Sequence, residues 1–279
     1  MTVDVDSATV YRDTVSKAGP LARSLAREAG AILRDRLHDI REITFKGDID
    51  LVTDVDHASE ALICAGILDE FPDHRITGEE GAVGAPGQTP ETQPFCWIID
   101  PLDGTTNYAH RYPHFAVSVA LEYRGEPVVG AVYDPMRDEL FAAERDHGAT
   151  LNDDPIRVSQ TSELRRALMA TGFSYDVRER AHASRLWEIF NDSIQGLRRD
   201  GAAALNIAWV AAGRLDGYFE RPVQSWDMAA GVLIAREAGG MVSALEHDGF
   251  DVYTPEALVT NGVLHDDIRA LILRTLAGA

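Results

Sequence analysis

The chain has little cysteine and no long hydrophobic run. Its two cysteines, Cys64 and Cys96, lie in no CxxC or Cys/His spacing that suggests a zinc site, so we predict two reduced thiols in the core. No window approaches the roughly 18 unbroken apolar residues of a membrane span, and the first six residues are acidic rather than basic. These features favour a cytoplasmic protein without a membrane partner.

Positive charge is also scarce. The 26 Lys and Arg residues face 45 Asp and Glu residues, which leaves a formal net charge of −19. Such a charge opposes binding to the phosphate backbone of nucleic acid, so we predict no nucleic-acid partner. An enzyme for an anionic substrate would have to overcome this field locally, and bound divalent cations are one way to do so.

The 279 residues, 45% of them apolar, are enough for a sizeable core. Apolar spacing and turn signals predict a layered pattern of helices and strands, with Gly239 and Gly240 ending one helix as a left-handed cap would. We predict helices at 21–37, 56–71, 183–195, 202–212, 227–238 and 265–276, and strands at 97–99, 115–123, 128–133, 139–143, 168–171, 217–219, 241–244 and 258–260. The stretch 81–94, rich in Gly, Pro, Thr and Gln, is expected to be a surface loop.

The segment 97–107, WIIDPLDGTTN, is the most informative one. An apolar strand leads into Asp100 and Asp103, and Pro101 is expected to end the strand because it removes a backbone donor and restricts φ. The resulting turn can direct both carboxylates and the Leu102 carbonyl toward one point. Hard oxygen ligands of this kind suit Mg²⁺.

Gly104 and Thr105 follow directly and are expected to open a helical turn. A glycine with free N–H groups and a hydroxyl beside it has the outline of a phosphate-binding loop. An ordinary Asp-Pro or Asp-Gly turn with an N-capping side chain would explain any one of these residues equally well.

Other carboxylates come from distant parts of the chain. Glu79 follows a short predicted strand, and Asp227 stands at a predicted helix start. Taken alone, Glu79 could belong to a solvated loop and Asp227 could simply cap its helix. If these carboxylates converge, their mutual repulsion requires cations.

At this point the sequence resembles the inositol monophosphatases, within the lithium-sensitive, metal-dependent sugar phosphatases. The resemblance spans nearly the whole chain and rests on five segments in the family's order: DLVTDVD at 50–56, GEE at 78–80, WIIDPLDGTTN at 97–107, GAAALN at 201–206 and WDMAAG at 226–231. It implies an α+β sandwich with alternating α/β/α/β/α layers. It also implies one catalytic domain over 1–279, with two lobes of about 1–150 and 151–279 and the metals at their junction.

The resemblance further implies two to three Mg²⁺ ions in each site. The first, which holds the attacking water, would be bound by Glu79, Asp100 and the Leu102 carbonyl. The second, near the leaving-group oxygen, would be bound by Asp100, Asp103 and Asp227, and Glu79 would help to hold a weaker third ion. Asp50 would accept a hydrogen bond from Thr105, which with Glu79 orients or deprotonates the water for in-line attack.

For the substrate, the resemblance assigns the phosphate to the backbone of Gly104 and Thr105. The alcohol would contact Asp103, Asp227, Glu220 and the turn formed by Gly201, Ala202 and Ala203. Glu220 favours a polyol, because a carboxylate accepts hydrogen bonds from hydroxyl groups. Lys46 is a candidate for a loop over the site.

Two residues depart from the family pattern near the expected substrate pocket. Asp200 adds a negative charge where an apolar residue is usual, and Gln224 replaces a histidine found in some members. Neither is among the expected metal ligands, so these departures bear on the substrate rather than on the chemistry.

The expected activity is Mg²⁺-dependent hydrolysis of a small phosphate monoester, with myo-inositol monophosphate first and histidinol phosphate as the strongest competitor. Fructose 1,6-bisphosphate, NADP and 3′-phosphoadenosine 5′-phosphate are substrates of related enzymes. A metal-binding regulatory protein without turnover is the alternative from another class. The resemblance also implies a homodimer and inhibition by Li⁺.

Overall fold

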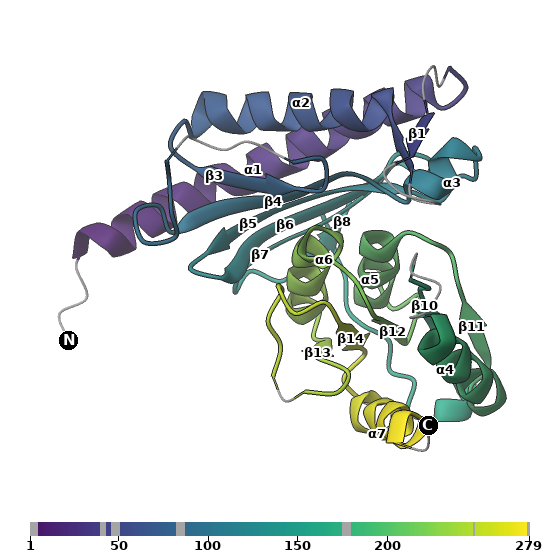
Figure 1. Ribbon diagram of the computed structural model, residues 1–279. Helices are drawn as coiled ribbons and strands as arrows, with labels where there is room; N and C mark the ends of the chain where they lie inside the picture. Colours follow the sequence, from purple (N-terminus) through teal and green to yellow (C-terminus); the bar gives the residue numbers. More distant parts are fainter. Residues whose placement is uncertain are drawn as a thin grey trace.

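The computed structural model describes residues 5–39, 43–45, 51–81, 87–174, 180–247 and 249–277. Two sheets separate three layers of helices (Figure 1). The outer layer on one side holds α1 (Val5–Arg36) and α2 (Asp54–Glu70), the middle layer holds α5 (Ala203–Ala211) and α6 (Ser225–Glu237), and the outer layer on the other side holds α4 (Arg180–Ser193) and α7 (His265–Ala277). This is the α/β/α/β/α sandwich predicted from the sequence.

The first sheet has seven strands in the order β3-β4-β5-β6-β7-β8-β9, and only the β3–β4 pair is parallel. It is a meander, because each strand from β4 onward pairs with the next one along the chain; the sequence analysis did not predict β8 and β9. Its strands are β3 (Arg75–Gly78), β4 (Phe95–Asp103), β5 (Ala116–Tyr123), β6 (Glu126–Asp134), β7 (Glu139–Glu144), β8 (Ala149–Leu151) and β9 (Asp154–Pro155).

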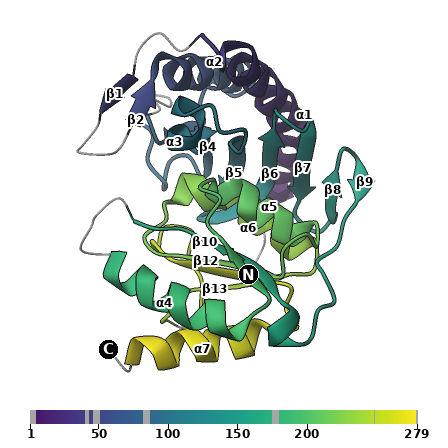
Figure 2. The ribbon, with the colours of Figure 1, turned by 90° about the vertical axis from the view of Figure 1, so that its right-hand side faces the viewer.

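The second sheet has five strands in the order β11-β10-β12-β14-β13. Its strands are β10 (Leu168–Thr171), β11 (Gly196–Arg198), β12 (Gly217–Glu220), β13 (Met241–Ser243) and β14 (Ala257–Thr260). In the described part of the chain, the remaining elements are an antiparallel pair of β1 (Ile43–Phe45) and β2 (Leu51–Thr53), the short helix α3 (Thr105–Ala109) and a 3₁₀ turn (Leu164–Arg166). Figure 2 shows α4 and α7 together under the second sheet.

Strand β4 illustrates how alternation builds these layers. All nine of its residues are buried, and successive side chains of a strand point to opposite faces. Trp97 and Ile99 join the core under α1 and α2, whereas Ile98 joins the core under α5 and α6. A strand covered by helices on both faces therefore reads as an unbroken apolar run.

The predicted boundaries differ most from the structure at α1 and β4. Helix α1 begins at Val5 rather than at residue 21, and Pro20 lies inside it. Strand β4 does not end at Pro101 but continues to Asp103, with a shift in its register against β5 between Asp100 and Asp103. A bulge of this kind lets a strand accommodate a residue that cannot donate to the ladder.

Other expectations are confirmed. Helix α6 ends before Gly239, whose φ of 90° is the left-handed conformation expected of a C-terminal glycine. Both cysteines are free, with Cys96 buried and Cys64 half-buried. Among the described residues, no helix is both long and apolar enough to cross a membrane.

Candidate functional site

The site begins at the end of β4. Asp100 and Asp103 are 1% and 5% exposed, and the register of β4 against β5 shifts between them. The Leu102 N–H donates to Asp100 Oδ1 at 2.9 Å, and Ser59 Oγ donates to the Pro101 carbonyl at 2.8 Å. These contacts fix the Asp100 carboxylate and the Pro101 backbone near the end of β4.

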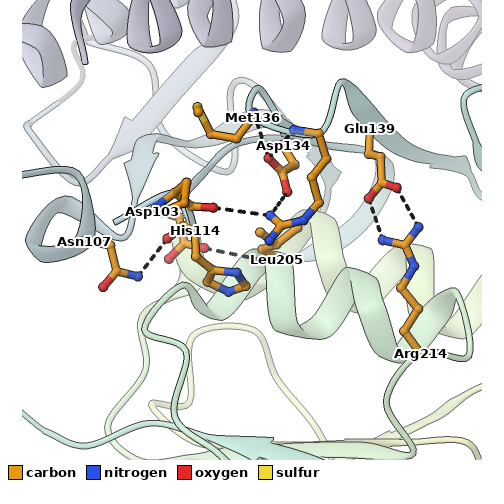
Figure 3. A network of polar contacts seen from close by, with 10 residues as sticks. Asp103, Asn107, His114, Asp134, Met136, Glu139, Leu205 and Arg214 are labelled. Atoms are coloured by element: carbon orange, nitrogen blue, oxygen red, sulfur yellow. Dashed lines mark hydrogen bonds and ion pairs between the residues drawn. The ribbon is translucent and has the colours of Figure 1, made fainter. Parts of the chain in front are cut away.

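The carboxylate of Asp103 contacts the start of α5, in the middle layer of helices. It accepts hydrogen bonds from the N–H groups of Ala203 at 2.9 Å, Ala204 at 2.8 Å and Leu205 at 3.4 Å. These are the first amides of α5, which have no partner inside the helix and carry its positive partial charge. Figure 3 shows Asp103 above the start of this helix.

A third carboxylate comes from the first turn of α6. Asp227 Oδ2 accepts a hydrogen bond from the N–H of the N-cap residue Gln224 at 2.8 Å, so this aspartate takes part in capping its helix through a capping box. It also meets the other two carboxylates: one oxygen each from Asp100, Asp103 and Asp227 lie within 4.8 Å of one another. The three residues thus converge from β4 and α6.

The electrostatics of this cluster are unfavourable for three negative charges. Burial raises the pKa of Asp100 well above its usual range, and the charges of Glu79, Asp103 and Asp227 raise it further. Burial also raises the pKa of Asp103, and it raises that of Asp227 to about 6 despite the hydrogen bond from Gln224. Close, desolvated carboxylates resist ionising together unless a cation joins them.

Thr105 begins α3 beside this cluster and is 8% exposed. Its hydroxyl lies 3.1 Å from the Leu102 carbonyl and 3.3 Å from Asp56 Oδ1. Asp56 is fully buried and was read from the sequence only as a helix start. The predicted partner Asp50, like Lys46, lies outside the described residues.

Two glycines, Gly104 before α3 and Gly201 before α5, allow these two segments to approach each other closely. Gly104 has a φ of 96°, and a Cβ there would lie 3.2 Å from the Gly201 carbonyl and 3.3 Å from the Cβ of Ala202. Gly201 has a φ of 87°. A side chain at Gly104 would therefore be strained by its backbone and would push α3 away from the start of α5.

A cleft of about 460 Å³ opens next to the carboxylates. It contains Glu79 and Glu220 as well as two of the clustered aspartates, so four acidic side chains border one space. It is lined by Glu79, Asp103, Thr171, Gly172, Phe173, Ser174, Arg199, Gly201, Ala202, Ala203, Asn206, Glu220, Pro222, Val223, Gln224, Trp226 and Asp227.

Glu220 stands at the end of β12 on the wall of this cleft. The buried Tyr218 hydroxyl donates to its Oε2, and a Cβ on Gly172 would overlap its carboxylate at about 2 Å. Burial raises the pKa of Glu220 to about 7, the charge of Asp227 contributes, and Arg199 opposes the shift. Tyr218 and Gly172 therefore hold Glu220 in place, and sequence analysis identified neither.

Arg199 is a cationic member of this cleft that the sequence analysis did not single out. Its Nη1 lies 2.7 Å from the point where a Cβ on Gly201 would stand. The backbone carbonyl of Asp200 accepts a hydrogen bond from Asn107 Nδ2 at 2.7 Å. The same amide donates to the His114 carbonyl at 2.7 Å.

The donor set fits a hard divalent cation. Asp100, Asp103 and Asp227 supply three carboxylate oxygens within 4.8 Å, and Mg²⁺ prefers oxygen ligands of this kind while retaining some of its waters. Burial raises the pKa of all three groups, and a bound cation would oppose this shift because it favours their ionised forms.

Comparison with known proteins assigns the family. The model of the inositol monophosphatase family matches residues 15–277. The chain belongs to this family. An inositol-1-monophosphatase of Synechocystis is 44% identical over 257 residues, which cover 91% of this chain and 88% of the relative. Another relative, named Nus factor SuhB, from Escherichia coli K12, is 44% identical over 228 residues, 80% of this chain and 83% of its own length.

Solved inositol monophosphatases share the fold. The structure of an inositol monophosphatase from Anabaena has a TM-score of 0.83 and 41% sequence identity, and the match covers 94% of this chain and 97% of that one. An inositol monophosphatase from Thermotoga maritima has a TM-score of 0.82 and 32% identity, with 91% and 96% covered. The chain is thus an inositol monophosphatase family member along nearly its whole length.

Proposed function

We propose that this protein is a Mg²⁺-dependent phosphatase that hydrolyses small phosphate monoesters, with myo-inositol monophosphate as its principal substrate. The observation that carries the proposal is the convergence of Asp100, Asp103 and Asp227 at one edge of an acidic cleft. Three buried carboxylates in contact are costly unless they bind cations. Membership of the inositol monophosphatase family supports the same activity.

The metal ligands in this proposal are Glu79, Asp100, the Leu102 carbonyl, Asp103 and Asp227, which would hold two to three Mg²⁺ ions. When bound, Mg²⁺ neutralises phosphate charge and lowers the pKa of water near the phosphorus. The Leu102 carbonyl already lies near the Thr105 hydroxyl, and a carbonyl oxygen has a second lone pair for a cation. The two roles of this carbonyl are therefore compatible.

The protein's own part in activating water belongs to Thr105 and Glu79. Thr105 Oγ1 is close to two acceptors, the carboxylate of Asp56 and the Leu102 carbonyl. A hydroxyl that donates its hydrogen to such an acceptor keeps its lone pairs free to accept from a water. We assign Asp56 the task of orienting Thr105, beside the assignment of Asp50 that the family pattern suggests. Glu79 would then take the proton of the attacking water.

Phosphate and alcohol would bind on opposite sides of the carboxylates. The N–H groups of Gly104 and Thr105 begin α3 and suit phosphate oxygens. Glu220 and the turn of Gly201, Ala202 and Ala203 border the same cleft and suit the alcohol hydroxyls, together with Asp103 and Asp227.

Substrate preference rests on the surroundings of Glu220. A carboxylate positioned by Tyr218 accepts hydrogen bonds from a polyol, and the Synechocystis relative is named for activity on inositol 1-phosphate. Histidinol phosphate stays the main competitor because its ammonium group would also pair with Glu220. Arg199 adds a positive charge near the same place, which favours substrates without a cationic group.

Several further features belong to the proposal. We expect a cytoplasmic homodimer that is inhibited by Li⁺ and that binds neither nucleic acid nor membranes. The relatives named Nus factor SuhB suggest a role besides turnover. The intact set of carboxylates favours catalysis, since a purely regulatory protein would not need Thr105 and Asp56 placed beside them.

The test is phosphate release from myo-inositol 1-phosphate, histidinol phosphate, fructose 1,6-bisphosphate, NADP and 3′-phosphoadenosine 5′-phosphate, each with Mg²⁺ and with EDTA. We expect metal-dependent turnover, with the highest kcat/KM for inositol phosphate. Preference for another ester would overturn the role given to Glu220 and keep the chemistry. The absence of metal-dependent turnover for every ester would refute the enzyme proposal.

A further inference from the structure

The side-chain amide of Asn107 joins α3 to the segment that leads into α5. Asn107 lies on α3, two residues after Thr105. Its Nδ2 donates to the His114 carbonyl, two residues before β5, and to the Asp200 carbonyl, directly before Gly201, both at 2.7 Å. Figure 3 shows the amide directed toward His114. One NH₂ group therefore holds a carbonyl beside the first sheet and a carbonyl beside the middle layer of helices.

An asparagine amide suits this position for a chemical reason. Both partners are carbonyl oxygens, which only accept hydrogen bonds, and the amide nitrogen carries two hydrogens to donate. An aspartate at 107 would have nearly the same shape but would place an oxygen against both carbonyls. An alanine would leave both carbonyls without this donor. Asn107→Asp and Asn107→Ala therefore break the same contact by different means.

The contact lies where backbone segments approach closely. A Cβ at Gly104 would lie 3.2 Å from the carbonyl oxygens of both His114 and Gly201. A Cβ at Gly201 would in turn lie 3.2 Å from Nδ2 and from Oδ1 of Asn107. The start of α3 and the turn before α5 thus meet at one point, and the hydrogen bonds of Asn107 act at that point.

A second contact between these regions is of a different kind. The carboxylate of Asp103 accepts hydrogen bonds from the N–H groups of Ala203 and Ala204, and the same carboxylate is a candidate metal ligand. Its oxygens would therefore be shared between α5 and a cation. The Asn107 amide is neutral and contacts backbone carbonyls, so neither of its two hydrogen bonds competes with a cation.

We propose that Asn107 is a positioning residue that sets the separation between the start of α3 and the turn 201–203. The inference rests on the proposed function, in which the start of α3 receives the phosphate and the turn receives the alcohol hydroxyls. A misplacement of about 1 Å can cost a hundredfold in rate, so loss of the Asn107 contact penalises substrates that engage both sides. Esters without alcohol hydroxyls are affected much less. Asn107 thereby selects for phosphates of polyols.

The test compares myo-inositol 1-phosphate with cyclohexyl phosphate, which has the same six-membered ring but no free hydroxyl group. We expect Asn107→Asp to lower kcat/KM about a hundredfold for inositol phosphate, mostly through KM, and less than about threefold for cyclohexyl phosphate. Asn107→Ala should show the same selectivity without adding a charge. Asn191→Asp is the control, since Asn191 is exposed on α4 and does not line the cleft. We expect wild-type kcat/KM for both esters in this control.

Equal losses for the two esters would overturn the positioning role, because they would show that Asn107 only supports the fold. Unchanged kcat/KM for inositol phosphate in Asn107→Ala would overturn it as well. Turnover of cyclohexyl phosphate by each variant shows that the variant is folded.

A binding measurement needs no catalysis. Saturation-transfer NMR of the ring protons of myo-inositol, with Mg²⁺ and inorganic phosphate present, reports the alcohol side, and phosphorus NMR reports the bound phosphate. An inositol signal that is lost in Asn107→Asp while phosphate stays bound supports the positioning role. The same result with neither ester hydrolysed by the wild type would support this role and refute the proposed function. A signal that is missing in the wild type, or unchanged in Asn107→Asp, would overturn the positioning role.

Discussion

The carboxylate of Asp103 accepts a hydrogen bond at 2.9 Å from the N–H of Ala203, a residue 100 positions further along the chain. This contact joins the last residue of β4 to the first residue of α5. The same side chain approaches Asp100 and Asp227. Asp103 is therefore both the cap of a central helix and a candidate metal ligand, and these two roles are experimentally separable.

Asp103→Asn and Asp103→Ala should differ in stability but not in activity. Asparagine keeps one acceptor oxygen for the amides of α5, whereas alanine leaves these amides without their cap. We expect the alanine variant to be less stable than the asparagine variant by about 1 kcal/mol, measured by urea unfolding. Both should lose more than about a hundredfold in kcat, since neither supplies a carboxylate to the metal.

Asp154→Asn is the matched control for this pair. Asp154 is exposed at the edge of the first sheet, so its substitution removes a carboxylate without touching the cleft. Wild-type activity and stability are expected. Equal stability of Asp103→Asn and Asp103→Ala would show that the contact with α5 contributes little.

Thr105 should act through its hydroxyl rather than through its shape. Thr105→Val keeps the volume but removes the group next to Asp56 and the Leu102 carbonyl. We expect kcat to fall by about 10² to 10⁴, the range for groups that assist proton transfer, while KM changes little. Thr105→Ser restores the hydroxyl and should recover most of the rate.

Asp56→Asn tests the orientation step separately. The amide keeps the size of the side chain but removes the charge of this fully buried group. We expect a smaller loss of kcat than in Thr105→Val, and no further loss when the two substitutions are combined. Additive effects would mean that Asp56 acts elsewhere, because coupled residues give non-additive losses.

The metal-free protein should become less stable as the pH rises. The pKa values of Asp227 and Glu220 are raised to about 6 and about 7, above their values of about 4 in an unfolded chain. Between these limits the folded state binds more protons than the unfolded state, so the free energy of unfolding falls from about pH 4 to pH 7. Mg²⁺ at pH 7.5 should raise the Tm again through binding to the folded state.

Thermal unfolding in EDTA and in Mg²⁺, followed by circular dichroism across this pH range, measures both effects. Asp227→Asn should flatten the pH dependence in EDTA and reduce the rise of Tm with Mg²⁺. A metal-free Tm that increases between pH 4 and pH 7 would contradict the assignment of these buried carboxylates.

Much of the site was predictable because local chemistry determines it. The apolar run before Asp100 indicates a buried strand. Pro101, which follows it, restricts the backbone conformations that the chain can adopt there. Asp227 was predictable as the start of a helix. The contact of Asp103 with α5 was not predictable from local pattern, because it depends on how two distant segments pack.

The errors have equally physical causes. The apolar spacing was read from residue 21 onward, yet α1 begins at Val5, since Val15 and Ala18 on its earlier turns are buried in the same core as Leu25. The short strand β11 lies at a sheet edge and has a single buried residue, so it carries no alternating pattern. Tyr218 and Gly172 matter only through Glu220, which becomes apparent only in three dimensions.

Tyr218 should position Glu220 rather than contact the substrate. Tyr218→Phe removes the hydrogen bond to Glu220, so we expect KM for inositol 1-phosphate to rise about tenfold with kcat within a factor of three. Glu220→Gln should raise KM by more, and the double variant should resemble Glu220→Gln alone. A large fall of kcat in Tyr218→Phe would show that the hydroxyl contributes to the chemical step.

The most direct test of the metal-dependent phosphatase is the rate of phosphate release as a function of Mg²⁺ concentration, in wild type and in Asp100→Asn. We expect no wild-type turnover in EDTA, saturable activation by Mg²⁺, and at least a hundredfold lower rate in Asp100→Asn at every Mg²⁺ concentration. Wild-type turnover that persists in EDTA, or a fully active Asp100→Asn protein, would contradict this expectation.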